Sequence, residues 1–178
     1  MKAALEAINH PSLKLVIAPH EITEKHLSAV QELFPTAVRY SQLTTHNSPL
    51  TIQHPSSGIL IIDNIGLLSR LYKYATITYI GGGFGKGIHN TLEAAVYGKP
   101  VLFGPMHHKF REATELIRNG GAIAISNTGD LATALQQLLA DEQEYTQRCN
   151  SSLQYIYENR GATDKIIRFI YEKRLLTS

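Results

Sequence analysis

The chain of 178 residues is long enough for one domain of ordinary size, or for two small domains. Hydrophobic residues make up 43% and charged residues 18% of the sequence, ordinary values that exclude a disordered tail and a coiled coil. The formal net charge of +2 gives no electrostatic reason to expect nucleic acid as a partner, and the single cysteine, Cys149, excludes an intrachain disulfide and a Cys-rich zinc site.

The first predicted element is a helix over Lys2–Asn9, with no capping residue ahead of it. In an alternating α/β domain a strand should precede such a helix. We therefore expect this chain to be a fragment whose first strand, and whatever lay before that strand, is missing. A carboxylate inside this helix, Glu6, argues against a signal peptide.

Short, β-branched apolar stretches then alternate with helical patterns. The predicted strands are Leu13–Ala18, Ala37–Tyr40, Ile59–Ile62, Thr76–Ile80, Pro100–Phe103 and Ala122–Ile125. The predicted helices between them are Glu24–Leu33, Ile65–Tyr74, Thr91–Tyr97 and Arg111–Asn119. Such alternation is typical of βαβ units, with a parallel sheet covered on both faces. We predict an α/β, Rossmann-like fold with a doubly wound, mostly parallel six-stranded sheet.

After Ile125 the pattern is helical. Thr128 and Asp130 open one helix, a longer polar helix follows to about Glu158, and an amphipathic helix is predicted over Asp164–Leu176. Its apolar side carries Ile166, Ile167, Ile170 and Tyr171. We expect residues 1–178 to form a single domain, with the helices of residues 142–178 packed on the sheet or reaching toward another domain. The Ser41–Ser57 segment is predicted to be a long, mobile loop.

The most informative motif is a glycine-rich loop, Gly81-Gly82-Gly83-Phe84-Gly85-Lys86-Gly87-Ile88-His89-Asn90. It follows a predicted buried strand and precedes a helix, which is where doubly wound sheets bind ligands. Glycines let backbone amides converge on one point, and a helix N-terminus adds partial positive charge, so phosphate is favoured. The loop fits neither the Walker A pattern nor G-x-G-x-x-G. It therefore indicates phosphate binding of another kind.

Two simpler interpretations remain open. The glycines could serve only a tight strand-to-helix turn, although one or two would be enough for that. Glu93 stands three residues after Asn90, in the register of a capping box, and could satisfy the helix terminus. Its functional alternative is to accept hydrogen bonds from ribose hydroxyls.

Other strands also end in polar residues or turns on the same expected edge. A Gly104-Pro105-Met106 turn follows one strand, Pro19-His20-Glu21 follows another, and Asp63-Asn64 a third. We expect His107 and His108 to be exposed loop residues. No carboxylate or third histidine has the spacing of a metal site, and no Ser-His-Asp or Cys-His arrangement can be argued.

With these motifs the stretch Asp63–Phe110 closely resembles the 3-deoxy-D-manno-octulosonic acid (Kdo) transferases. The resemblance rests on the order of Gly81-Gly82-Gly83, Gly87-Ile88-His89-Asn90-Thr91-Leu92-Glu93-Ala94-Ala95, Gly98-Lys99-Pro100-Val101 and Phe103-Gly104-Pro105. It extends more loosely over the whole chain and matches the C-terminal half of these enzymes. They have the two-domain GT-B fold, and they transfer Kdo from CMP-Kdo to lipid A precursor in Gram-negative lipopolysaccharide synthesis, at the cytoplasmic face of the inner membrane.

The resemblance implies that this chain holds the CMP-Kdo donor. Gly81, Gly82, Gly83, His89 and Asn90 would face the phosphate and sugar, and Glu93 the ribose. The cytidine would be bordered by Pro19, His20, Gly104, Pro105 and Met106. Many members have Arg-His after the proline, where this chain has His20-Glu21.

The resemblance also implies that the catalytic base is a carboxylate of the absent N-terminal half. No catalytic residue is therefore expected in this chain. The fragment would be soluble, and it would be inactive alone. The lipid A precursor and the membrane would be met only by the full-length protein. No metal or other cofactor is expected, because amide dipoles can stabilise the leaving phosphate. The alternatives are a UDP-sugar epimerase, another GT-B transferase, or a non-catalytic nucleotide-binding module.

Overall fold

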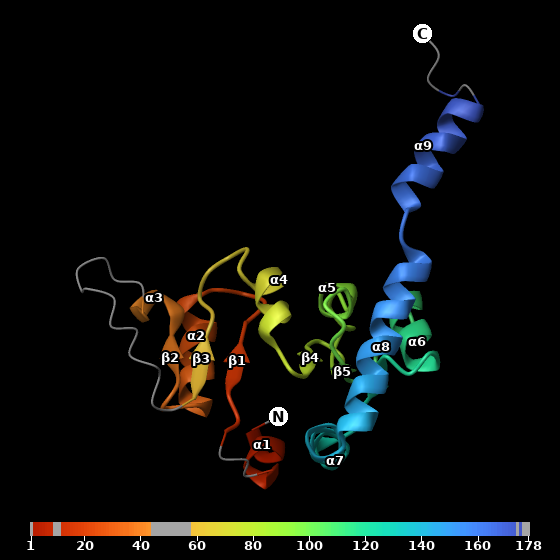
Figure 1. Ribbon diagram of the computed structural model, residues 1–178. Coiled ribbons are helices and arrows are strands. Elements are labelled where there is room, and N and C mark those ends of the chain that lie inside the picture. Colours follow the sequence, from red (N-terminus) through yellow and green to blue (C-terminus); the bar gives the residue numbers. More distant parts are fainter. Residues whose placement is uncertain (1, 9–11, 44–57, 174, 176–178) are drawn as a thin grey trace. The chain divides into compact units, whose positions relative to one another are not determined.

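The computed structural model describes residues 2–8, 12–43, 58–173 and 175 (Figure 1). The chain divides into two compact units, Met1–Tyr74 and Ala75–Ser178. Each unit contains its own three-stranded sheet, and all the strands of both sheets are parallel. The predicted single domain over residues 1–178 remains a prediction.

The first unit is built on a sheet with the strand order β1-β3-β2. Its elements are α1 (Lys2–Ile8), β1 (Leu15–Ile17), α2 (Glu24–Leu33), β2 (Val38–Arg39), α3 (Tyr40–Leu43), β3 (Ile59–Ile61), α4 (Leu68–Leu71) and a 3₁₀ turn η1 (Tyr72–Tyr74). Thr23 caps α2, because its hydroxyl accepts a hydrogen bond from the His26 amide. A small core joins helix to sheet, with Leu27 of α2 packed together with Ala37 and Ile61.

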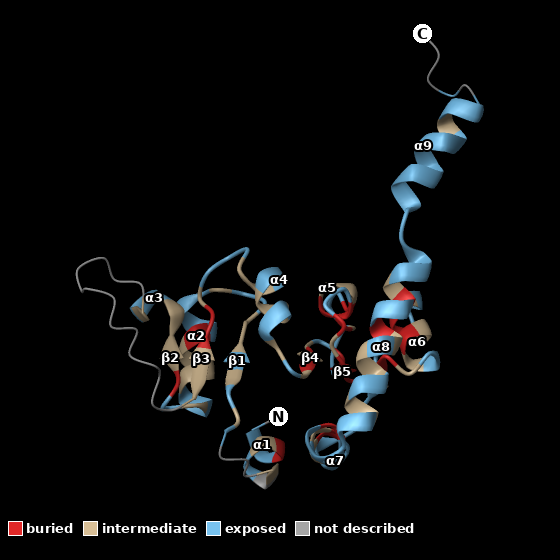
Figure 2. Cartoon of the chain, in the orientation of Figure 1, coloured by how far each residue is buried: buried red, intermediate tan, exposed pale blue. Residues whose placement is uncertain are grey.

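The second unit has the strand order β4-β5-β6. Its elements are β4 (Thr78–Ile80), α5 (Leu92–Ala95), β5 (Val101–Phe103), α6 (Arg111–Arg118), β6 (Ala122–Ala124), α7 (Thr128–Ala140), α8 (Glu142–Asn159) and α9 (Ala162–Glu172). The central strand β5 is completely buried, and Figure 2 shows it in red. Its continuous apolar sequence is typical of a parallel strand covered on both faces.

Helix α8 packs against three other helices of the second unit, α5, α6 and α7. Glycines bring it close to the sheet: a Cβ on Gly121 would lie 2.8 Å from the Ser152 hydroxyl oxygen, and one on Gly98 2.7 Å from Leu153 Cγ. The fully buried Ser152 hydroxyl lies 3.0 Å from the Lys99 carbonyl oxygen and 3.2 Å from that of Gly121. This part of the tail therefore packs on its own unit.

Helix α9 is amphipathic but has no buried residue, and its ribbon in Figure 2 is mostly pale blue with a tan segment. Its apolar residues are largely open to solvent, with Ile166 58% and Tyr171 78% exposed. Among the described residues, no helix is both long and apolar enough to span a membrane.

The α/β class, the six parallel strands and their order along the chain confirm the predicted fold class. The strands are shorter than predicted, and their hydrogen-bonded pairs form two sheets of three rather than one ladder of six. Helix α2 has the predicted bounds, and Gly98 and Gly120 have the positive φ angles expected of residues that end helices.

Several predicted helices need correction. The segment predicted as Ile65–Tyr74 contains only α4 and the η1 turn, and α9 begins at Ala162, two residues before the predicted start. Gly161 does break the helical tail, with a φ of 85°. In the predicted Ser41–Ser57 loop, residues 41–43 complete α3, and residues 44–57 lie outside the described part of the chain.

Candidate functional site: a glycine loop at the carboxyl edge of the second sheet

The glycine loop leaves β4 at the carboxyl edge of the second sheet and folds back on itself. The Gly82 carbonyl accepts hydrogen bonds from the Gly85 and Gly87 amides, at 2.9 and 3.4 Å, and the Gly81 carbonyl accepts one from the His89 amide at 3.2 Å. Gly82 has a φ of 88°, and a Cβ there would overlap the Gly87 carbonyl oxygen. A larger residue at position 82 would therefore open the loop.

The Gly-Pro turn after β5 lies directly against this loop. A Cβ on Gly83 would come within 2.5 Å of the Gly104 amide nitrogen, so two glycine backbones are in contact here. The Met106 amide donates a 2.9 Å hydrogen bond to the Gly83 carbonyl and fixes the turn to the loop. Gly83, Gly104, Pro105 and Met106 are thus brought together, as their position on neighbouring strands predicts.

Backbone donors are available in the loop. Within the described part of the chain, neither the Gly82 amide nor the Gly83 amide donates a hydrogen bond. Gly82 is exposed, and Gly83 is buried against Gly104. Unpaired amides of successive residues at a sheet edge are the donors that a phosphate oxygen requires.

The polar residues that follow the glycines are held by one another. The Asn90 side-chain oxygen accepts a 3.0 Å hydrogen bond from the Leu92 amide, while its nitrogen donates to the Glu93 carboxylate at 3.1 Å. The His89 ring lies beside the loop, with Nε2 3.4 Å from the position of a Cβ on Gly82. His89 and Asn90 are both exposed. The arrangement is compatible with capping and leaves the ribose hypothesis open.

The helix after the loop is much shorter than predicted. The segment Thr91–Tyr97 contains α5 over four residues only, and its N-terminal position is occupied by Thr91, whose side chain makes no capping bond. One turn of helix aligns few peptide dipoles. The anion-binding capacity of this edge therefore rests on the loop amides, and the expected contribution of a helix N-terminus is corrected to a minor one.

The two remaining predicted site residues belong to the first unit. Pro19 and His20 follow β1 and line a hollow of about 260 Å³ beside α2. The other lining residues are Glu21, His26, Ala29, Val30 and Leu33. At its rim a Glu21 carboxylate oxygen lies 3.3 Å from Nδ1 of His26.

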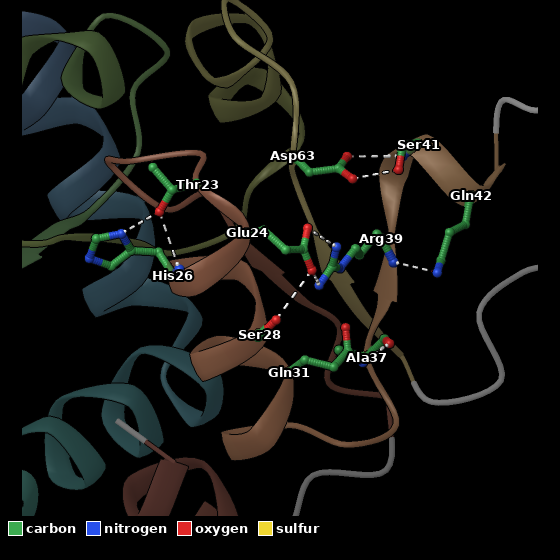
Figure 3. Close-up of polar contacts among 10 residues, drawn as sticks. All are labelled: Thr23, Glu24, His26, Ser28, Gln31, Ala37, Arg39, Ser41, Gln42 and Asp63. Atoms are coloured by element: carbon green, nitrogen blue, oxygen red, sulfur yellow. Dashed lines mark hydrogen bonds and ion pairs between the residues drawn. The ribbon is translucent and has the colours of Figure 1, made fainter.

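The polar residues at the carboxyl edge of the first sheet are engaged with one another (Figure 3). Arg39, at the end of β2, forms a two-pronged ion pair with Glu24 at 2.8 and 2.9 Å. Burial disfavours the ionised form of Asp63, but hydrogen bonds from the Ser41 hydroxyl and amide outweigh it and lower the pKa of the Asp63 carboxyl. These partners give the cluster a structural role.

Two buried polar residues were not recognised from the sequence. His107, expected to be exposed, is only 8% exposed and packs its ring at 5.3 Å from that of Phe103, while His108 is exposed. Within the described residues, His107 Nδ1 and the hydroxyl of the buried Thr91 have no hydrogen-bond partner. The contact of the Phe110 ring with Gly87 was also not predicted from the sequence. Each side chain folds inward from a loop, which no periodicity reveals.

A metal centre is not among the features of this edge. The described residues contain no group of three or more His, Cys, Asp or Glu side chains that could hold a metal ion. The groups that this edge does present are backbone amides, the His89 imidazole and the side-chain pair of Asn90 and Glu93.

Sequence comparison relates the chain to curated enzymes. No family model matches it. The 3-deoxy-D-manno-octulosonic acid transferase of Rickettsia conorii is 30% identical over 149 residues, which are 82% of this chain and 32% of that enzyme. The enzyme of the same name from Aquifex aeolicus is 29% identical over 137 residues, 76% of this chain and 36% of that enzyme. The chain thus spans about a third of the length of these relatives.

Solved structures share the fold. The C-terminal CMP-Kdo binding domain of WaaA from Acinetobacter baumannii superposes with a TM-score of 0.73 at 19% identity, over 87% of this chain and 80% of that domain. The C-terminal domain of a group 1 glycosyl transferase, LpcC from Francisella tularensis, gives 0.59 at 14% identity, over 90% and 76%. The resemblance drawn from the motifs is confirmed: the chain is homologous to the 3-deoxy-D-manno-octulosonic acid transferases and has the fold of a C-terminal GT-B glycosyltransferase domain.

Proposed function

We propose that this chain is the donor-binding part of a glycosyltransferase that transfers Kdo from CMP-Kdo to lipid A precursor. The observation that carries the proposal is the homology to Kdo transferases over 82% of the chain. The solved WaaA domain of the same fold binds CMP-Kdo, as its name states. Binding of the acceptor, and transfer at the cytoplasmic face of the inner membrane, would require the full-length protein of a Gram-negative bacterium.

The glycine loop supplies the chemistry that such a donor needs. When the sugar leaves CMP, negative charge develops on the phosphate oxygen that was bonded to it. Amides that are already oriented stabilise such charge without reorganising during the reaction. The donors we assign to this phosphate are the amides of Gly82 and Gly83, which follow β4 and donate no hydrogen bond within the described part of the chain.

We assign the remaining contacts to the neighbouring residues. The exposed His89 and Asn90 would meet the phosphate and the sugar, and Glu93 the ribose hydroxyls. The Gly104-Pro105-Met106 turn, which is bonded to the loop through the Met106 amide, would border the cytidine. The assignment of Pro19 and His20 to the cytidine remains a prediction from the resemblance. The base that deprotonates the acceptor would come from the part of the relatives that this chain does not match.

The test is calorimetric titration of the chain with CMP and with UMP. We expect CMP to bind and UMP to bind at least about tenfold more weakly, a difference of about 1.4 kcal/mol. The reverse preference would favour a UDP-sugar epimerase or a transferase that uses a UDP-sugar. If neither nucleotide bound, the proposal would be contradicted. The chain would then be a non-catalytic module that does not bind nucleotides.

A further inference from the structure

The glycine loop carries one aromatic residue, Phe84, whose place in the loop is fixed by a turn. The Gly85 amide donates a 2.9 Å hydrogen bond to the Gly82 carbonyl and closes a four-residue turn in which Phe84 is the third residue. Phe84 directly follows the two glycines whose amides we assign to the phosphate. Because adjacent Cα atoms are about 3.8 Å apart, its side chain begins within the length of one nucleotide from those amides.

The Phe84 ring leans across the loop toward the Gly-Pro turn after β5. A Cβ on Gly104 would lie 2.8 Å from Cδ2 of Phe84, so the ring edge occupies the space that a side chain at position 104 would fill. Gly104 begins the Gly104-Pro105-Met106 turn, which we assign to the border of the cytidine. The ring therefore lies on the side of the loop where the nucleoside of the donor is expected.

Most of this ring is not used for packing within the second unit. Phe84 is 56% exposed in the whole chain, so its own unit leaves at least that fraction uncovered. Among the rings of the described residues, none stacks on it. Met106, on the same turn as Gly104, is 50% exposed as well, whereas Phe103 in β5 is fully buried. The loop and the turn thus present an apolar surface with an aromatic face beside the proposed phosphate donors.

We propose that the Phe84 ring stacks on the base of the donor nucleotide. Every nucleobase has a flat π face, and stacking on an aromatic side chain is favourable for all of them. The sugar acid of the donor carries hydroxyl groups and requires polar partners, which at this edge are His89 and Asn90. The inference rests on the proposed function, because it takes the ligand of the glycine loop to be a nucleotide.

The proposal is tested by titrating the wild-type chain and a Phe84→Ala variant with CMP and with ribose 5-phosphate. Ribose 5-phosphate has the ribose and the phosphate of CMP but lacks the base. We expect Phe84→Ala to weaken CMP binding at least about tenfold and to change the affinity for ribose 5-phosphate by less than about twofold. Phe84→Tyr, which keeps an aromatic ring, should bind CMP nearly as well as the wild type.

Phe169→Ala is the matched control. Phe169 is 52% exposed and belongs to α9, so this variant also removes an exposed ring from the second unit but none from the candidate site. We expect it to bind both ligands as the wild type does. UMP separates stacking from the choice of base, because uracil stacks as cytosine does. Phe84→Ala should weaken the binding of CMP and of UMP by the same factor, whichever of them the wild type prefers.

NMR of the wild-type chain with CMP measures the contact directly and does not depend on how a variant folds. We expect a nuclear Overhauser effect between the Phe84 ring protons and H5 or H6 of the bound cytosine, with an upfield shift of those two resonances.

The proposal would be overturned if CMP bound without this contact. Equal losses of affinity for CMP and ribose 5-phosphate in Phe84→Ala would also overturn it, because the ring would then only support the loop. An equal loss in Phe169→Ala would do the same. These outcomes leave donor binding in place, whereas a wild-type chain that bound neither CMP nor UMP would contradict the proposed function and the stacking contact together.

Discussion

At the scale of single residues, the candidate site depends on two glycine backbones in contact. Gly83 and Gly104 come from the loops after neighbouring strands, and a side chain on either would collide with the other. The close approach places the Gly-Pro turn beside the glycine loop, whose Gly83 carbonyl accepts a hydrogen bond from the Met106 amide. The identity of these glycines is therefore a requirement of the site and exceeds what a simple turn needs.

Glu93 allows the two interpretations of the polar pair to be separated. If the carboxylate binds ribose, Glu93→Ala should weaken CMP binding about tenfold, the loss of one hydrogen bond to a charged group, and leave the melting temperature nearly unchanged. If it serves only to hold Asn90, the same variant should lower the melting temperature and leave the affinity for CMP unchanged. Titration and thermal unfolding of one variant decide between them.

Glu142 supplies the matched control for this experiment. It is an exposed acid in the first turn of α8, and Glu93, which is half-buried, is an acid in the first turn of α5. Glu142→Ala should leave the affinity for CMP unaltered. A loss of affinity in both variants would indicate an effect of overall charge and would argue against a ribose contact.

The local polar contacts were predictable in part. The register of Asn90 and Glu93 predicts a capping box with Asn90 as the cap, whereas the structure has Thr91 at the N-cap position and joins the Asn90 and Glu93 side chains directly at 3.1 Å. The burial of His107 was not predictable, because it depends on how a loop folds over Phe103. Sequence periodicity describes helices and strands and carries no such information for loops.

At the scale of secondary structure, the sequence predicts where elements lie better than how long they are. The buried strands are found at the predicted places, since continuous apolar stretches can be satisfied only inside the sheet. Helix α5 is only one turn long: Val96 is its C-cap, and a turn that ends at Gly98, with a left-handed φ of 64°, then leads the chain back toward β5. The length of a helix between two fixed strands is thus decided by packing.

Helix α8 gives a prediction at this scale. Ser152→Ala removes the only side-chain hydroxyl that reaches the Lys99 and Gly121 carbonyl oxygens in the described structure. One acceptor is partly buried and the other is buried, and both lose that partner. We expect the free energy of unfolding to fall by about 1–2 kcal/mol, measured by urea denaturation.

The neighbouring serine on the same helix is the control. Ser151→Ala should change the stability by less than about 0.5 kcal/mol, because its hydroxyl forms no hydrogen bond within the described residues. Equal effects of the two substitutions would show that the contact of α8 with the sheet does not depend on the Ser152 hydroxyl.

At the scale of the whole molecule, the chain is a pair of α/β units homologous to about a third of a Kdo transferase. The fold class followed from the alternation of apolar strands and helical patterns. The division into two sheets did not, because strand order depends on which edges find partners, and a linear pattern does not record this.

The central claim is that the amides of the glycine loop bind the phosphate of a cytidine nucleotide. The most direct measurement is the change in the amide NMR resonances of Gly82 and Gly83 on addition of CMP, compared with addition of cytidine. We predict that CMP shifts both resonances and that cytidine, which lacks the phosphate, leaves them nearly in place. The claim would be contradicted if CMP bound while both resonances stayed fixed, or if cytidine shifted them as strongly.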